Sequence, residues 1–527
     1  MLDIFKQIYL NSILYDKKIS KAGDNYLEYR PSSHLLSSIV KVKNKKLNID
    51  DFSLESVWTN NNLNQKQLNK LNNFFWLFSI DLKSSNTSVQ LIIKNWIQIN
   101  KKYNFKSWGF DTTSKRLIAW LSNSKLTYDQ SDENYKKLFS NLIRKQTFHL
   151  LNQIDKIEIF NEKLTGIASI ILVGLSYKDE KNFISKGLGY LKKILKSSLD
   201  NFGFPKSRSI KQSIFLLKYL IIIREWFKES QLEIPEFINE HIYYLGQSYS
   251  FFWKNLNFDP LFNGNNISDN QEFDNYLKRL GYSFENKNSE FSDYVILKNK
   301  KINLLMDIGP SPIKKFSNEY QAGALSFEFI SNGKKIFTNS GYYNNKNPKL
   351  NQFSRSSASH NVLIIDDNSS CKFKKKSNDI YEINEGLKIT KKKIIFEKNY
   401  WNINAAHDGY LKKYNILYER EIEFYPENNK IIGIDKLIGK KIISNLKFDI
   451  RFHLNSAIKI MKTQDNKSIL IDADGEGWRF TCNNYKIDID KGLFFGKKNT
   501  SIENQNIFIS GIINSQNNNI IWEIVKI

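Results

Sequence analysis

The sequence predicts an α+β protein with more than one domain, in which a helical N-terminal half precedes antiparallel sheets. Its 527 residues exceed what one hydrophobic core usually supports. From about residue 50 to 290, apolar residues recur at spacings of three and four, which is the period of a helix with one buried face. From residue 291 onward the spacing changes to two, which is the period of a strand.

The pattern of the helical half predicts successive helices joined by short polar or glycine-containing breaks. These helices are expected at 82–96, 137–153, 164–175, 188–199 and 214–226. Short links favour antiparallel helical pairs. The most apolar run, 214–223, is interrupted by Lys218 and is too short to span a bilayer. We therefore expect it to be a buried helix, and we expect no transmembrane segment.

The pattern of the second half predicts two packed antiparallel sheets. Strands are expected at 302–307, 422–424, 431–434 and 469–473. The clearest local signal is the pair Asn332 and Gly333 between the alternating residues Phe327, Phe329 and Ile336. An Asn-Gly pair in this setting predicts a two-residue hairpin turn with positive φ at both positions.

Composition and charge limit the classes of partner. Hydrophobic residues make up 41% and aromatic residues 14%, which is typical of a folded protein. The net charge of +24 would attract a polyanion such as a uronate polymer or a nucleic acid. Alternatively, the charge reflects a general bias in composition, because Lys, Asn and Ile are raised together along the whole chain. No zinc-finger spacing, recognition helix or ribonucleoprotein motif is visible, so we expect no nucleic-acid partner, and nonspecific binding through net charge is the competing hypothesis.

The cysteines and the N-terminus say little about the compartment. Cys371 and Cys482 lie far apart in the sequence, both in the predicted β-half. They can pair only if their strands meet, and we interpret them as two buried thiols. The first residues lack a long apolar core followed by a small-residue cleavage site. This absence favours the cytoplasm.

The densest group of polar and small residues lies between positions 321 and 366. It reads Gln321-Ala-Gly-Ala-Leu-Ser-Phe-Glu-Phe, then Thr-Asn339-Ser-Gly-Tyr-Tyr, then Ser-Arg355-Ser-Ser-Ala-Ser-His360-Asn. Arg355 and His360 flank a run of small residues and lead into the apolar strand expected at 362–365. This arrangement places a cation beside a titratable ring, with room for a ligand.

This stretch resembles the β-domain of the heparinase II/III-like family, whose members carry His-Ala-Asp-Ala-Leu-Ser-Phe-Glu, Asp-Pro-Gly and Arg-Ser-Thr-Ala-Ala-His-Asn. Further similar motifs occur at 71–77, 108–121, 407–410, 451–454 and 475–480, so the resemblance covers roughly residues 50 to 520. It implies an incomplete α/α toroid with a concave cleft, followed by an antiparallel β-sandwich. The implied domains are an N-terminal arm at 1–50, the toroid at 51–290 and the sandwich at 291–527.

Characterised members of the family are polysaccharide lyases that cleave uronic-acid chains such as heparan sulfate or alginate. The resemblance therefore implies β-elimination on an anionic polysaccharide. This reaction needs a group that neutralises the carboxylate, a base for the C5 proton and an acid for the leaving oxygen. The candidate catalytic residues are His360, Tyr342, Tyr343 and Asn161. For each of them an ordinary packing role is the alternative.

Substrate binding is expected from cationic and amide side chains of the same motifs. The planar fork of Arg355 suits a carboxylate or sulfate, although a structural Arg that binds loop carbonyls is the alternative. Lys206 and Arg208 keep the segment 202–212 cationic, and a solvated turn between helices is the alternative there. The candidate substrate-binding residues are Arg355, Arg208, Asn339, Gln321, Asn361 and His407.

The family's metal ligands are only partly present. Members of the family bind a metal through the His of His-Ala-Asp, the Asp of Asp-Pro-Gly and the His of His-Asn. Gln321 and Asn339 occupy the first two positions here, so only His360 remains. Neutral amides are poor substitutes for an imidazole and a carboxylate. We therefore predict no metal and no other cofactor at this site.

The helical half also departs from the family pattern. Gln212 lies near the position of the catalytic Tyr, so the usual base is missing. The resemblance implies a metal-independent lyase, and a non-catalytic carbohydrate-binding protein that kept the fold is the alternative. Family resemblance favours the periplasm or cell envelope, against the cytoplasmic expectation from the N-terminus. The sequence does not predict the sugar or the oligomeric state.

Overall fold

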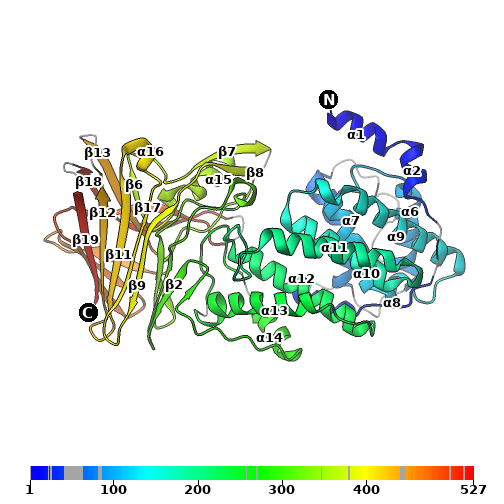
Figure 1. Cartoon of the computed structure of the whole chain (residues 1–527), viewed down its shortest axis with the longest axis horizontal. Helices are drawn as coiled ribbons and strands as arrows, with labels where there is room; N and C mark the ends of the chain where they lie inside the picture. Colours follow the sequence, from blue (N-terminus) through cyan, green and yellow to red (C-terminus); the bar gives the residue numbers. More distant parts are fainter. Residues whose placement is uncertain are drawn as a thin grey trace. The chain divides into compact units, whose positions relative to one another are not determined.

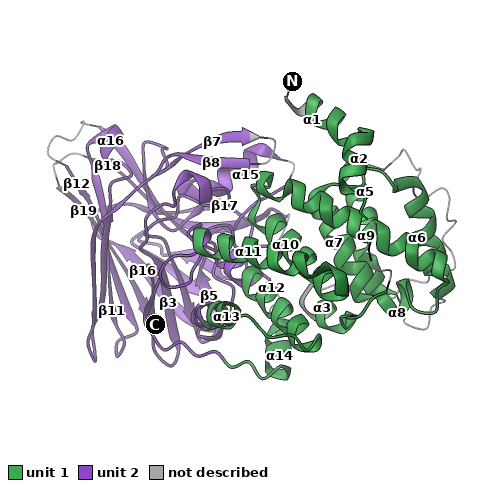
Figure 2. Cartoon of the chain, turned by 45° about the vertical axis from the view of Figure 1, so that its right-hand side comes forward, with its two compact units in different colours: residues 1–197, 215–243, 270–283 green, residues 198–214, 244–269, 284–527 purple. Residues whose placement is uncertain are grey.

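The structure is a computed structural model, and it describes residues 2–21, 23, 26–40, 58, 63–80, 86–256, 258–268, 271–345, 347–377, 380–439, 445–497, 500–513 and 517–527. The chain forms two compact units, which Figure 2 distinguishes by colour. Unit 1 comprises residues 1–197, 215–243 and 270–283, and unit 2 comprises 198–214, 244–269 and 284–527. The boundary predicted at residues 50 and 51 lies outside the described residues, and the predicted domain limits stay a prediction.

Helices build unit 1 (Figure 1). Those up to α9 are α1 (Leu2–Leu10), α2 (Ile13–Ile19), α3 (Ser33–Val40), α5 (Gln65–Asn72), α6 (Asn86–Asn100), α7 (Phe110–Ser122), α8 (Ser124–Thr127) and α9 (Glu133–Gln153). They are followed by α10 (Phe160–Ser176), α11 (Lys181–Ser198), α12 (Ile210–Glu229), α13 (Glu236–Tyr249) and α14 (Gln271–Arg279), of which α12 and α13 continue into unit 2. The five predicted helices are confirmed as α6, α9, α10, α11 and α12, with residues 82–85 of the first outside the described residues.

The core of unit 1 is built on α10 and on tryptophans of its neighbours. Residues 164–176 of α10 are buried throughout. Its Gly166 allows close approach to α7, since a Cβ there would lie 2.4 Å from the Phe110 ring. The rings of Trp96 and Trp120 meet edge to face with centroids 5.6 Å apart. Trp108 is also buried, so Trp108 and Trp120 both pack in the core.

Antiparallel sheets build most of unit 2 (Figure 1). A five-stranded sheet runs in the order β1 (Glu290–Phe291), β2 (Tyr294–Lys298), β3 (Ile302–Asp307), β4 (Phe327–Ser331) and β5 (Lys334–Phe337). An eight-stranded sheet has the order β14 (Lys459–Lys462), β15 (Ser468–Asp472), β16 (Gly477–Cys482), β19 (Asn517–Lys526), β12 (Lys430–Ile438), β11 (Leu417–Tyr425), β10 (Trp401–His407) and β9 (Ile389–Phe396).

Two smaller sheets and short helices complete unit 2. A four-stranded sheet has the order β17 (Ile487–Phe494), β18 (Ile502–Ile513), β13 (Leu446–His453) and β6 (Leu363–Ile365), and β7 (Lys372–Ser377) pairs with β8 (Ile380–Glu385). The short helices include α15 (Pro348–Arg355), η6 (Ser357–Ser359) and α16 (Leu411–Tyr414). All the strands predicted from the sequence are present, at β3, β6, β11, β12 and β15.

The predicted hairpin is also confirmed. β4 pairs with β5 across Asn332 and Gly333, whose φ angles are 46° and 76°. Positive φ at both residues gives the turn the twist that the two strands need.

Large aromatic side chains join the sheets into one core. Phe327 of β4 stacks on Trp522 of β19 with ring centroids 5.6 Å apart. Phe452 of β13 meets Trp522 at 4.9 Å and Phe327 at 6.2 Å. The five-, four- and eight-stranded sheets therefore bury their inner faces against each other, which confirms the predicted β-sandwich. Cys371 and Cys482 are free thiols, of which Cys371 is buried as expected and Cys482 is only partly buried, and desolvation raises the pKa of each to about 12. Among the described residues, no helix is long and apolar enough to cross a membrane.

Candidate functional site

His360 stands between η6 and β6, at the C-cap of η6. Its Nδ1 lies 2.9 Å from the carbonyl oxygen of Ser356. Because a carbonyl only accepts, Nδ1 carries the proton and Nε2 presents a lone pair. Burial lowers the pKa of His360 to about 4, so the ring is neutral at neutral pH. In the part of the chain that the structure describes, Nε2 is buried and has no hydrogen-bond partner.

A glycine makes room for this imidazole. A Cβ built on Gly323 would lie 2.4 Å from Cδ2 of His360 and 3.0 Å from its Nε2. Any side chain at position 323 would displace the ring. Gly323 belongs to the segment that begins at Gln321, so this segment shapes the space that the His360 ring occupies.

Gln321 is fully buried and ties three segments together. Its Oε1 accepts from the backbone N–H of Gly264 at 3.0 Å. Its Nε2 donates to the carbonyl oxygens of Gly341 at 3.0 Å and Ser354 at 2.6 Å. Both ends of the amide are thus engaged by main chain.

Asn339 and Asn361 form a second amide link. Oδ1 of Asn339 accepts from the N–H of Asn361 at 3.1 Å. The side chain of Asn361 donates to the carbonyl of Phe327 at 2.8 Å and accepts from the N–H of His453 at 2.6 Å. Nδ2 of Asn339 is buried without a partner among the described residues, as is Nε2 of His360. His360 therefore has an unpaired acceptor, and Asn339, which binds the N–H of the next residue along the chain, has an unpaired donor.

Arg355 ends α15 and is fully buried. Its guanidinium donates to Asn351 Oδ1 at 3.0 Å, to the Tyr320 carbonyl at 3.3 Å and to the Tyr342 hydroxyl. It also lies over the ring of Tyr381, 5.2 Å from the centroid. The cation is thus enclosed by protein groups.

The two tyrosines of the second motif are buried as well. Burial raises the pKa of Tyr342 to about 12, although the nearby Arg355 opposes the rise. Tyr342 is consequently a protonated phenol at neutral pH. Tyr343 is 8% exposed and packs its ring on Phe495, with centroids 5.5 Å apart.

Arg208 is a buried anchor in unit 2. Its Nη2 donates to Asp307 Oδ1 at 2.6 Å. The guanidinium lies directly over Gly309, where a Cβ would be 2.1 Å from Cζ. Asn263 donates to the other carboxylate oxygen of Asp307 at 3.0 Å and to the Tyr294 hydroxyl at 2.7 Å. Asp307 therefore neutralises the charge of Arg208, which the sequence analysis had assigned to binding an anionic sugar.

The other two candidates lie elsewhere. His407 ends β10 and accepts at Nδ1 from the N–H of Gly409 at 3.1 Å, and burial lowers its pKa to about 4. Its ring packs between Tyr410 and Tyr418. Asn161 lies in the first turn of α10 in unit 1, half-buried, where its carbonyl accepts from the Thr165 hydroxyl at 2.9 Å. The site assignments stay predictions. The other seven candidates lie on three segments that these hydrogen bonds hold together, although the His360 side chain bonds only to the Ser356 carbonyl: Gln321, Asn339, Tyr342, Tyr343, Arg355, His360 and Asn361.

Sequence reasoning missed the carboxylate that supports this network. Glu328 of β4 is fully buried. It accepts from the N–H of Leu261 at 3.2 Å, from Lys335 Nζ at 2.8 Å, from the Thr338 hydroxyl at 2.9 Å and from the N–H of Asn339 at 3.0 Å. The Glu in the Leu-Ser-Phe-Glu motif was the available signal, because a carboxylate between two strand phenylalanines has to find partners when buried.

The residues at the family's metal positions do not fit a divalent metal. Gln321 has no free ligand atom, and the Asn339 oxygen is taken by the peptide N–H of Asn361. His360 alone retains a lone pair, whereas zinc sites use three or four protein ligands. Nowhere in the described ranges do three or more His, Cys, Asp or Glu side chains form a group that could hold a metal. We therefore derive no step through a metal.

Solved structures identify the class of fold. The heparinase III BT4657 gene product with methylated lysines is 13% identical and superposes with a TM-score of 0.71, covering 97% of this chain and 85% of its own. The heparan sulfate lyase HepC from Pedobacter heparinus is 12% identical with a TM-score of 0.65, covering 97% and 86%. A further heparinase III is 13% identical with a TM-score of 0.69, covering 96% and 87%. The chain has the fold of these heparinases, with a toroid-like helical region and a β-sandwich.

The sequence match covers the C-terminal part. Residues 286–523 match the family model described as "Heparinase II/III-like, C-terminal", so this part of the chain is a heparinase II/III-like C-terminal domain. A search of curated protein sequences finds no match.

Proposed function

We propose that this protein cleaves a uronic-acid-containing anionic polysaccharide by β-elimination and does so without a metal. The observation that carries the proposal is the family match over 286–523. Two of the similar solved proteins are named heparinase III and heparan sulfate lyase, and heparan sulfate is an anionic polysaccharide. The net charge of +24 favours the approach of such a polymer.

In the proposed reaction His360 takes the C5 proton and Tyr342 protonates the leaving oxygen. Nε2 of His360 carries a lone pair without a hydrogen-bond partner, and the ring is neutral, as a base requires. Tyr342 is a phenol that keeps its proton at neutral pH, which is the state an acid needs. Tyr343 is the alternative acid, and Asn161 is proposed to neutralise the uronate carboxylate. His360 is only 1% exposed, so this role requires the segment around it to open for substrate.

The remaining candidates are proposed to support substrate binding mostly by holding loops in place. Gln321, Asn339, Asn361 and Arg355 hold the loops around His360, and their own polar groups are largely engaged by protein. They are proposed to fix the surface that contacts the sugar. Arg208 and His407 are proposed to do the same for their own segments.

A second candidate function is non-catalytic binding of an anionic carbohydrate. The burial of His360, Tyr342 and Arg355 counts against catalysis by these groups, because a group that reacts with a polymer has to reach it. So does Gln212, which lies near the family's catalytic Tyr position and whose side chain accepts from the Ser207 hydroxyl.

One assay separates the two functions. The absorbance of unsaturated uronates is followed on heparan sulfate, chondroitin, hyaluronan, alginate and polygalacturonate, with and without chelator. The lyase predicts a chelator-resistant rise on at least one of these polymers. Binding of a polymer without any rise would establish the non-catalytic function. Binding with a steep salt dependence and no preference among sugars would instead favour nonspecific polyanion association, including nucleic acid.

A further inference from the structure

The first two helices expose a group of large apolar side chains. Phe5 is 65% exposed and Ile8 is 62% exposed on α1, and Ile13 and Leu14 are 68% and 75% exposed on α2. Tyr9, at 46%, shares a face of α1 with Phe5 and Ile8 because of the spacing of three and four residues. Single exposed apolar residues are ordinary, but a group on consecutive turns usually marks an interaction surface.

The end of α1 and one side of α2 pack within unit 1. Leu10, Tyr15 and Ile19 are buried. The hydroxyl of Tyr15 lies 2.7 Å from Nδ1 of His149 on α9, and Ser12 caps the start of α2. The exposed side chains of α2 are thus carried on a helix that is attached to α9. Both views show α1 and α2 at the margin of unit 1 (Figure 1 and Figure 2).

A lysine-rich loop lies beside α1. The hydroxyl of Tyr103 donates to Gln7 Oε1 at 3.3 Å, which places the loop 101–106 next to the helix. Phe105 in this loop is 58% exposed. Lys101, Lys102 and Lys106 are also exposed, as is Lys6 on α1. Residues 5–15 and 101–106 contain no Asp or Glu.

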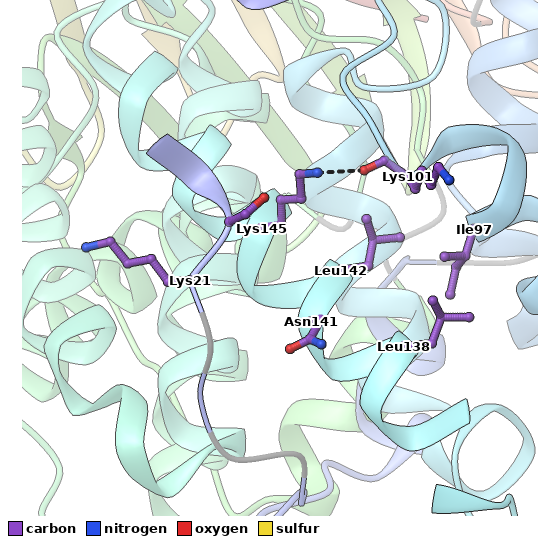
Figure 3. Close-up of a pocket in the computed structure, with 8 residues that line it drawn as sticks. Lys21, Ile97, Lys101, Leu138, Asn141, Leu142 and Lys145 are labelled. Carbon is purple, nitrogen blue, oxygen red and sulfur yellow. Dashed lines mark hydrogen bonds between the residues drawn. The ribbon is translucent and has the colours of Figure 1, made fainter. Parts of the chain in front are cut away.

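The end of α2 opens onto a pocket of about 350 Å³ with the same chemistry (Figure 3). Its wall contains Ile97 of α6 with Leu138 and Leu142 of α9. Lys21, Lys101 and Lys145 line it as well. Lys145 donates to the Lys101 carbonyl at 2.8 Å and pairs with Asp16 at 2.7 Å, so the only acidic side chain of α2 is already neutralised.

We propose that this surface binds the interface of an anionic lipid bilayer. We call it the N-terminal surface, and it consists of Phe5, Lys6, Ile8, Tyr9, Ile13, Leu14, Lys101, Lys102, Phe105 and Lys106. Aromatic and aliphatic side chains flanked by lysines insert at the headgroup boundary, while the ammonium groups meet anionic headgroups. The pocket then accepts an anionic headgroup among its lysines. This inference does not depend on the proposed lyase activity.

A second copy of the chain is a poorer occupant. A two-fold contact through the same surface would set the lysines of one copy against those of the other, with no carboxylate from residues 5–15 or 101–106 to pair with them. Like charges held together in a contact of this kind are unfavourable. A bilayer supplies many anionic groups over a flat area and has no such mismatch.

Vesicle co-sedimentation tests the proposal with the full chain. Vesicles of phosphatidylcholine alone are compared with vesicles of equal phosphatidylcholine and phosphatidylglycerol. The protein is expected to sediment with the anionic vesicles only, and less so as salt is raised. The double variant Phe5→Ser/Ile13→Ser is expected to bind at least about tenfold more weakly, since two inserting side chains are lost. The variant Lys101→Glu/Lys102→Glu is expected to lose the preference for anionic lipid.

The matched control is Ile313→Ser, which removes an apolar side chain of similar exposure, 67%, from unit 2. It is expected to bind vesicles as the wild type does. Absence of vesicle binding, equal binding to neutral and anionic vesicles, or equal loss in the control would overturn the proposal. If Phe5→Ser/Ile13→Ser instead abolished self-association seen by light scattering, without vesicle binding, the surface would be a protein contact.

Discussion

Replacing Gln321 with Leu tests whether the amide holds the loops around His360. The side chain is 0% exposed, and it joins the loop at Gly264 to Gly341 and Ser354. Leu keeps most of the volume but removes every hydrogen bond. One buried N–H and two buried carbonyl oxygens would then lose a partner.

The size of the effect follows from these three groups. A buried main-chain group that loses its partner costs about 1–3 kcal/mol, and better burial of an apolar side chain offsets part of the sum. We expect Gln321→Leu to lower the free energy of unfolding by about 3–5 kcal/mol. Gln352 is exposed on α15, so Gln352→Leu is the matched control and is expected to change stability by less than about 0.5 kcal/mol.

Urea unfolding followed by tryptophan fluorescence and by far-ultraviolet circular dichroism measures both variants. Because the chain has two compact units, hydrogen exchange of the segments 261–266 and 341–355 is measured alongside, to locate the effect. The reasoning predicts faster exchange in both segments for Gln321→Leu alone. A change in stability below about 1 kcal/mol, with exchange unaltered, would refute it.

Three further predictions concern buried groups of unit 2. Glu328→Gln leaves Lys335, whose side chain is 11% exposed, without its fully buried carboxylate partner and should cost about 3–5 kcal/mol, read from urea unfolding, whereas a neutral result would mean that the pair contributes nothing net. Gly323→Ala should displace the His360 ring and lower any lyase rate at least about tenfold without unfolding the sandwich, and an unchanged rate would separate that ring from the chemistry. The three buried histidines of unit 2 have pKa values lowered by burial to about 3 or 4, below the unfolded value. Below about pH 6.5 the unfolded state binds protons on these rings and the folded state does not, so the free energy of unfolding should fall as pH falls toward 4. Unfolding titrations should show a decrease of about 3 kcal/mol per histidine, and a flat profile would contradict their burial.

Local signals were sufficient for much of the fold. The change of period near residue 291 coincides with β1, and the Asn-Gly pair specified the hairpin because turn geometry depends on two residues alone. Helices with a strong apolar period, such as α9 and α10, were placed within a few residues of their bounds. Patterns of this kind depend on residues that are close together in the sequence, so a single sequence is enough to detect them.

The network around His360 could not be predicted in the same way. The partners of Gln321 lie 20, 33 and 57 residues away, and no local pattern connects them. Arg208 was interpreted as a substrate cation because its partner Asp307 is 99 residues distant. Contacts also group residues 198–214 and 244–269 with unit 2, although α12 and α13 run across the limits of these segments. Long-range packing decides all three.

The measurement that tests the central claim most directly is the rate of unsaturated uronate formation by chelator-treated protein, with His360→Ala as the comparison. It is made on whichever polymer of the panel the wild type binds. The account predicts a chelator-resistant rise for the wild type and loss of the rise in the variant, with the far-ultraviolet spectrum unchanged. Activity that vanishes with chelator, or that persists in His360→Ala, would contradict a metal-independent lyase centred on this histidine.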